Sequence, residues 1–200
     1  MALASEETRA MSAACASAGV TLGTAFMMRF HSQHRAALKL VQEGRLGQPV
    51  FARAQLSCWY PPIPKAWRQE PLLGGGGSLM DLGGHCIDLL EMFFGHVKAV
   101  TCVTNRIVHD YPVEDGAIAT LLFDNGALGV VDTFFCVPDE SSRNVLELYG
   151  SRGSILAKGT IGQADSGQMI AYLKSQASGY DAMQQRSSSE PQPITPVPVN

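Results

Sequence analysis

The first thirty residues combine a helical hydrophobic pattern with a short apolar run. Small apolar residues recur at helical spacing over residues 5–18, and Glu6 and Glu7 lie in the first turn, where the helix dipole favours acidic side chains. We expect Ser5 to cap this helix. The run over residues 20–26 predicts a buried strand. A helix that leads into a buried strand is typical of a βαβ unit.

The central third of the chain predicts two helices around one strand. Apolar residues at helical spacing indicate a helix that begins at Ser32. Gly44, Gly47 and Pro49 should end it. A strand is expected over residues 50–58. A proline-rich loop then leads to the glycine run at residues 74–77, which delivers the chain into a longer helix over residues 79–94.

The remainder alternates with the two-residue period of strands. Strands are expected over residues 100–108, 117–123 and 127–137, and a hairpin should join residues 145–149 to residues 155–158. Asn125-Gly126 predicts a type I′ turn, because both residues tolerate a positive φ. Successive hairpins build an antiparallel sheet. The fold class is therefore α+β, with an open, mostly antiparallel sheet and packed helices.

Both ends of the chain have an unusual organisation. Only four residues precede the first helix, which leaves no room for the opening strand of a βαβ unit. Residues 163–200 are rich in serine, glutamine and proline, and we expect them to form an exposed arm without closing elements. This pattern predicts an internal fragment in which residues 1–29 end one domain and residues 30–200 form most of a second.

Composition and charge narrow the class of partner. The chain is 46% hydrophobic and 16% charged, which is typical of a globular protein, and it has no apolar stretch that could span a bilayer. Its net charge is -3 and it has no basic run, which argues against a nucleic-acid surface. Five cysteines without a C-x-x-C pair predict reduced thiols and a cytoplasmic location. We expect a small-molecule partner, and neither nucleic acid nor membrane.

One predicted helix carries the residues that could perform chemistry. At about 100° per residue, Asp81, His85 and Asp88 fall within roughly 60° of one another, away from an apolar stripe. Two carboxylates that flank an imidazole can fix its tautomer and let it exchange protons near neutral pH. Gly83 and Gly84 within the helix cost about 1 kcal/mol each relative to alanine, which indicates that something packs close to this backbone.

Structural roles explain the same residues and stay open. Ser78 and Asp81 have the spacing of a capping box, and His85 can be a core histidine with Asp88 as its partner. The glycine run lacks the G-x-G-x-x-G spacing and the Gly-Lys-Ser/Thr ending of phosphate-binding loops. Its backbone amides could still meet a polar ligand at a helix N-terminus.

A metal site of the sugar-isomerase type is a further alternative. Its donors would be His31 and His34, three residues apart, together with Asp81, His85 and Cys86. The two histidines lie at a predicted helix start, where polar residues are expected, and no spacing links them to the later helix.

The loop before the glycine run is rich in aromatic residues. Trp59, Tyr60, Trp67 and Arg68 have the composition to stack on a sugar or a nicotinamide ring. The same residues could instead clamp the loop to the protein.

Three segments together resemble the Gfo/Idh/MocA family of NAD(P)-dependent sugar and polyol oxidoreductases. They are EETRAMSAACASAGVTLGTAFMMRFH, HRAALKLVQEGRLGQPVFARAQ and WRQEPLLGGGGSLMDLGGHCIDLLEMFFG. The D-x-G-x-H-x-x-D pattern of the last segment is the most specific part. The resemblance implies that residues 1–29 are the last helix and strand of a Rossmann domain. Residues 30–200 would then be an α+β substrate domain that forms homo-oligomers through its sheet.

The resemblance also implies roles for individual residues. His85 would shuttle the hydroxyl proton while Asp81 orients the substrate and the imidazole, and NAD or NADP would exchange the hydride. No metal is implied. Asp88 matches the motif without a defined role. The positions that would line the nicotinamide and the sugar are Arg29, Trp67 and Arg68.

The family's G-x-G-x-x-G turn and its Glu-Lys-Pro motif, whose lysine completes the catalytic group, have no counterpart in this sequence. We therefore expect the 200 residues to be inactive alone and the parent chain to have about 330 to 380 residues, as two such domains require. A ligand-binding or dimerisation module without turnover is the alternative function.

Overall fold

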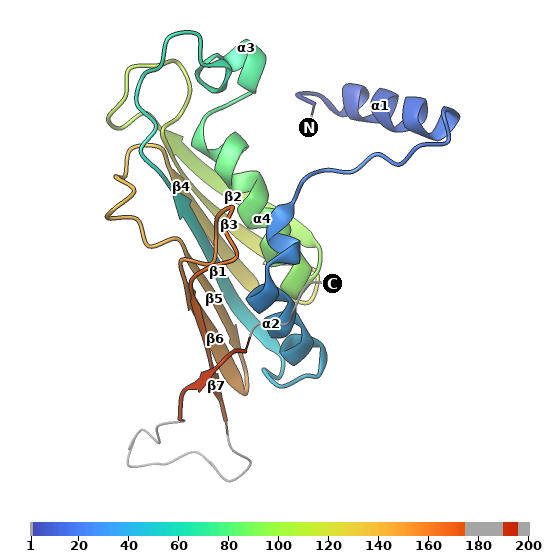
Figure 1. The fold of residues 1–200 in the computed structure, drawn as a ribbon, viewed down its shortest axis with the longest axis vertical. Helices are drawn as coiled ribbons and strands as arrows, with labels where there is room; N and C mark the ends of the chain where they lie inside the picture. The colour runs from blue at the N-terminus through green and yellow to red at the C-terminus, as the bar shows by residue number, and fades with distance from the viewer. Residues whose placement is uncertain (1, 175–189, 196–200) are drawn as a thin grey trace.

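The computed structural model describes residues 2–174 and 190–195, and its body is one open sheet with helices on one face (Figure 1). The strands are β1 (Pro49–Ser57), β2 (Val97–Asn105), β3 (Gly116–Phe123), β4 (Leu128–Phe134), β5 (Val145–Gly150), β6 (Gly153–Lys158), β7 (Gln168–Leu173) and β8 (Gln192–Pro193). The helices are α1 (Ser5–Ser17), α2 (Ser32–Gln42), α3 (Pro71–Gly74) and α4 (Gly84–Phe94). Shorter helical turns are the 3-10 segments η1 (Met27–Phe30) and η2 (Trp67–Gln69) and the π-type segment η3 (Leu79–Gly83). None of these helices is long and apolar enough to cross a membrane.

The sheet has the strand order β2-β3-β4-β1-β5-β6-β7-β8, and within the described part of the chain only β1 and β4 pair in parallel. Strands that follow one another in sequence form every antiparallel pair except β1 with β5, and the β3–β4 and β5–β6 pairs are joined by tight turns. β1 is first in sequence and lies in the middle of the sheet. The predicted α+β fold with an open, mostly antiparallel sheet is confirmed.

The core lies between the sheet and α4. Alternate residues of β1 are buried against the helix, among them Ala52 and Ala54. The facing side of α4 follows the helical period and contributes Cys86, Leu89, Leu90 and Phe93. Full burial of one leucine side chain stabilises a fold by about 1.5–3 kcal/mol. This contact therefore fixes the axis of α4 and, with it, the position of the turn that precedes the helix.

The β3–β4 hairpin forms where it was predicted, but its turn type differs. Gly126 has a φ of +86°, whereas Asn125 is not among the described residues with positive φ. The Gly126 N–H donates to the Phe123 carbonyl at 3.0 Å, and the Phe123 N–H donates to the Ala127 carbonyl at 2.9 Å. This is a three-residue loop with one left-handed glycine, so the type I′ prediction is wrong.

The segment expected to be an exposed arm is in part a strand. β7 pairs with β6, and its alternate residues Met169 and Ala171 are buried. β8 pairs with β7, and Ile194 beside it is also buried. Alternation of apolar side chains outweighs the polar composition of this region. The rest of the predicted arm, residues 175–189 and 196–200, lies outside the described residues.

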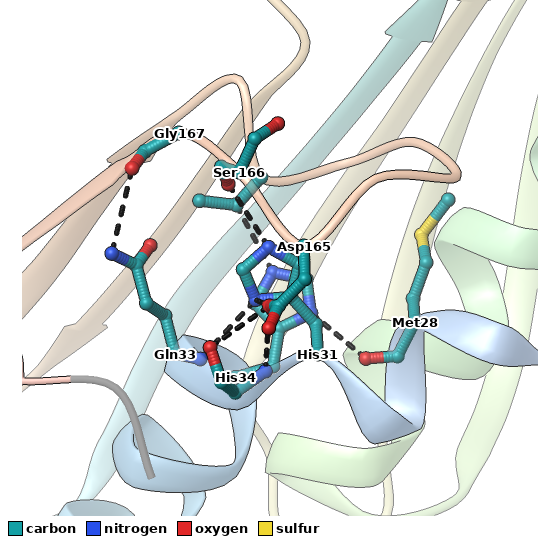
Figure 2. Close-up of polar contacts among 9 residues, drawn as sticks. Met28, His31, Gln33, His34, Asp165, Ser166 and Gly167 are labelled. Atoms are coloured by element: carbon teal, nitrogen blue, oxygen red, sulfur yellow. Dashed lines mark hydrogen bonds and ion pairs between the residues drawn. The ribbon is translucent and has the colours of Figure 1, made fainter. Parts of the chain in front are cut away.

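Two histidines fasten the loop of residues 159–167 to the start of α2 (Figure 2). The rings of His31 and His34 stack with centroids 4.4 Å apart. One nitrogen of the wholly buried His34 contacts the backbone of η1, and the other lies 3.0 Å from the Thr160 hydroxyl. His31 Nδ1 lies 3.2 Å from the Asp165 carboxylate. These rings therefore hold the loop that leads from β6 to β7.

The N-terminal segment differs from its prediction in two respects. α1 forms, but Ala4 rather than Ser5 is its N-cap, and the Glu7 carboxylate accepts the backbone N–H groups of Leu3 and Ala4. The strand expected over residues 20–26 is absent. The described chain offers this segment no neighbouring strand, and residues 20–25 are exposed whereas Phe26 is partly buried. The assignment of residues 1–29 to a second domain stays a prediction.

Candidate functional site

A cavity of about 440 Å³ lies at the N-terminal end of the η3–α4 helix. Three parts of the chain form it: the first residues up to Glu7 with the linker before η1, the loop that carries η2 and α3, and the beginning of η3 and α4. The lining side chains and backbone that matter for chemistry belong to Phe26, Trp67, Arg68, Gly74, Gly76, Asp81, Gly84 and His85.

A residue distant in sequence caps the start of the helix. The Glu114 carboxylate accepts the backbone N–H groups of Gly77 and Leu79 at 2.9 and 3.0 Å. A side chain at Gly77 would collide with the Glu114 carbonyl oxygen, so this close approach requires glycine. Ser78 instead donates its hydroxyl to the Thr133 carbonyl. The capping box read from Ser78 and Asp81 is therefore wrong.

Asp81 forms a salt bridge with Arg68 in the wall of the cavity. Arg68 Nε donates to Asp81 Oδ1 at 2.7 Å, and the guanidinium lies 4.4 Å from the centroid of the Trp67 ring. The hydrogen bond to Asp81 raises the pKa of Arg68 above its ordinary value. An aromatic face, a cation and a carboxylate thus lie next to one another in the wall of one cavity.

His85 lines the same cavity but has no carboxylate partner. Its Nδ1 is buried without a hydrogen-bond partner among the described residues, and the ring meets Phe26 edge-on with centroids 5.7 Å apart. Asp81 binds Arg68 instead, and Asp88 binds Arg29. The expectation that two carboxylates serve the imidazole is wrong, because each carboxylate pairs with a charged arginine, Asp81 through one hydrogen bond and Asp88 through a forked contact.

The wider turn of η3 helps to explain why Asp81 and His85 line the cavity whereas Asp88 does not. Asp81 lies in a π-type segment, whereas His85 and Asp88 follow in the regular helix α4. A π-type turn shifts the angular phase of the residues that precede it. Asp81 and His85 both reach the cavity, and Asp88 does not line it.

Arg29 lies outside the cavity as described. Its Nε and Nη2 donate to both oxygens of Asp88, with the shortest distances 2.8 Å. It is not among the residues that line the cavity. A contact between Arg29 and a nicotinamide or sugar stays a prediction.

The remaining candidates have structural contacts. Trp59 packs edge-on against His109 with centroids 4.9 Å apart, and Tyr60 packs against Phe135 at 4.8 Å.

Within residues 2–174 and 190–195, no three histidine, cysteine or acidic side chains gather as a metal site would require. The five cysteines are free.

Sequence reasoning missed Phe26 and Glu114, which shape the site. Phe26 ended a predicted strand, and Glu114 precedes β3 in a loop without any recognisable motif. Their contacts join residues far apart in the chain, so no local signal could have identified them.

Comparison with known proteins covers most of the chain. D-xylose 1-dehydrogenase (NADP(+)) 2 from Haloferax volcanii is 34% identical over 67% of this chain and 40% of its own length. 1,5-anhydro-D-fructose reductase from Ensifer adhaerens is 29% identical over 84% of this chain and 50% of its own length. The chain thus spans half or less of the length of these two curated relatives.

Solved structures of the same fold cover the chain more completely. Aldose-aldose oxidoreductase from Caulobacter crescentus, complexed with glycerol, matches 100% of this chain and 55% of its own, with a TM-score of 0.83 and 28% identity. Levoglucosan dehydrogenase, in complex with NADH and levoglucosan, matches 96% of this chain and 52% of its own, with a TM-score of 0.78. At 22% identity the second likeness shows the fold alone.

The sequence model of the GFO/IDH/MocA C-terminal domain matches residues 34–156, which is more than half of the chain. This stretch includes η3 and α4 with Asp81 and His85, and five of the eight strands. The chain belongs to the Gfo/Idh/MocA family of oxidoreductases.

Proposed function

We propose that the protein is an NAD(P)-dependent oxidoreductase of the cytoplasm that transfers a hydride between a nicotinamide and a hydroxyl or carbonyl carbon of a sugar or polyol. The observation that carries the proposal is that Asp81 and His85 share one cavity with Trp67 and Arg68. The names of relatives such as the xylose dehydrogenase and the anhydrofructose reductase support a sugar substrate. The five free cysteines agree with a reducing compartment.

The cavity fits the reacting end of a nicotinamide cofactor. Gly74, Gly76 and Gly84 present backbone to it, and Phe26 and Trp67 supply aromatic surface on which a flat ring can stack. When bound, the nicotinamide would supply the carbon that accepts or donates the hydride. The side chains of this chain would hold the substrate and move the proton.

We assign the transfer of the substrate's hydroxyl proton to His85. Its ring lines the cavity, and no hydrogen bond from the described residues occupies its nitrogens, so a substrate hydroxyl can become the partner. An imidazole changes its protonation near neutral pH, as the oxidation of a hydroxyl or the reduction of a carbonyl requires. Asp81, held by Arg68, would orient neighbouring hydroxyl groups of the substrate.

Turnover by the full-length protein tests the proposal. The protein should reduce NAD or NADP with at least one member of a panel of aldoses, anhydro sugars and polyols, and Asp81→Asn should raise KM for that substrate. Binding of sugars without any turnover, in either direction and with both cofactors, would favour the non-catalytic module instead.

We also propose that a second copy of the chain covers the open face of the sheet. Val103 and Ile118 lie opposite each other on β2 and β3, and with Leu128 they are exposed on the face away from α4. Large apolar side chains that are exposed on one face of a sheet can pack against the same face of a second copy. Sedimentation should show a dimer for the unmodified protein and a monomer for Val103→Glu; a monomer in both would contradict the proposal.

A further inference from the structure

We propose that Arg29 and Asp88 are positioning residues that hold Phe26 against the imidazole of His85. The proposal rests on the function proposed above, because it concerns the same cavity and the same histidine. It assigns a role to two residues that do not line the cavity themselves.

The pair joins two segments that are far apart in sequence. Arg29 lies in η1 and Asp88 in α4, one helical turn after His85. Arg29 Nε lies 2.8 Å from Asp88 Oδ2, and Arg29 Nη2 lies 2.8 Å from Asp88 Oδ1. A two-pronged contact between a planar guanidinium and a carboxylate restricts the relative orientation of both groups. The pair therefore sets how η1 lies on α4.

The segment that this pair anchors includes the wall beside His85. The backbone N–H of Arg29 donates to the carbonyl of Phe26 at 3.2 Å, so the two residues belong to one tight turn. The Phe26 ring meets the His85 ring at an interplanar angle of 87°. Thr24 and Ala25, which precede Phe26, also line the cavity. Movement of η1 along α4 would move this whole wall.

The orientation of the His85 ring depends on such packing. Its Nδ1 is buried and has no hydrogen-bond partner among the described residues, so no polar contact fixes the ring from behind. In sites where a third group orients a catalytic histidine, that group is usually hydrogen-bonded to it. Here the Phe26 ring, nearly perpendicular to the imidazole, takes that place, and the Arg29–Asp88 pair holds Phe26.

A purely stabilising role is the alternative explanation for the Arg29–Asp88 ion pair, and it is the weaker one. The Arg29 and Asp88 side chains are 43% and 12% exposed, and solvent on the arginine side weakens the contribution of such a pair to the free energy of unfolding. The chain offers a matched control in Arg53 and Asp132, a similar ion pair with a 2.9 Å contact and a 36% exposed arginine. Arg53 lies on the opposite face of the sheet from α4.

The test follows the His85 ring directly in the full-length protein with isotope-labelled histidines. Proton signals of the imidazole report the neighbouring aromatic ring, and Phe26→Leu defines the change expected when that ring is lost. We expect Arg29→Gln and Asp88→Asn each to move the His85 signals toward those of Phe26→Leu. Asp88→Glu should retain the original signals in large part, and Arg53→Gln should leave them unchanged.

Kinetics supply the second readout. Arg29→Gln and Asp88→Asn should lower kcat about tenfold, as a misplaced catalytic group does, with KM changed less than about twofold. His85 signals that are unchanged in both variants would overturn the proposal, whatever the activity. Shifted signals in a protein that has no turnover would sustain the positioning role and reject the oxidoreductase function.

Discussion

Arg68 donates to Asp81 across 2.7 Å while its guanidinium lies over the ring of its neighbour Trp67. The loop before the glycine run is thereby joined to the first turn of the η3–α4 helix, in the wall of the cavity. The geometry uses two properties of arginine together: its flat face and its fixed set of donors.

Arg68→Lys should therefore impair substrate binding although it conserves the charge. A lysine ammonium cannot lie flat on the indole and hold Asp81 in the same orientation. In the full-length protein we expect KM for the sugar to rise about fivefold to tenfold with a smaller effect on kcat, about 1 kcal/mol of lost binding. Steady-state kinetics measure this. Arg106→Lys, outside the cavity, is the control, and an unchanged KM in Arg68→Lys would show that the flat contact is unimportant.

The buried His34 should make the fold sensitive to acid. Burial lowers the pKa of His34 from 6.5 to about 4. As the pH falls below 6.5, the unfolded chain binds this proton before the folded chain does, so the free energy of unfolding declines. The loss should approach about 3 kcal/mol near pH 4 and stay constant at lower pH. Above pH 6.5 the group has no effect on the pH dependence.

Urea unfolding between pH 7 and pH 4 measures this effect. His34→Gln should flatten the decline in this range, whereas the control His96→Gln should leave it unchanged, because His96 is 90% exposed. An equally steep decline in His34→Gln would mean that other groups control the acid response.

Gly77 should tolerate no side chain. A Cβ atom at this position would collide with the carbonyl oxygen of Glu114, whose carboxylate caps the helix start. We expect Gly77→Ala to lower the free energy of unfolding by about 1–3 kcal/mol, as overpacking does. Gly23→Ala is the matched control, since nothing lies within 4 Å of a Cβ atom there. Equal thermal stability of the two variants would argue against the close approach.

Local signals in the sequence predict much of the fold. The β3–β4 and β5–β6 hairpins form at the predicted turns because each depends on glycines between two alternating segments. Asp81 and His85 were expected on one side of a helix, and both line one cavity, because their spacing of four residues is close to one helical turn.

The remaining features depend on contacts between distant residues. Arg29 and Asp88 are 59 positions apart, and Glu114 is 35 positions from Leu79. No pattern within one segment reveals which arginine a carboxylate will bind. The wrong prediction of an exposed arm where β7 forms has a different origin. The polar composition of this region hides the alternation of buried apolar residues such as Met169.

In the proposed reaction His85 moves the proton of the reacting hydroxyl. The most direct measurement compares kcat/KM of His85→Ala with that of His96→Ala in the full-length protein, on a substrate that the unmodified protein turns over. We predict a loss of about 10²- to 10⁴-fold for His85→Ala and an unchanged value for the exposed His96→Ala. Full activity in a folded His85→Ala variant would show that His85 does not move this proton.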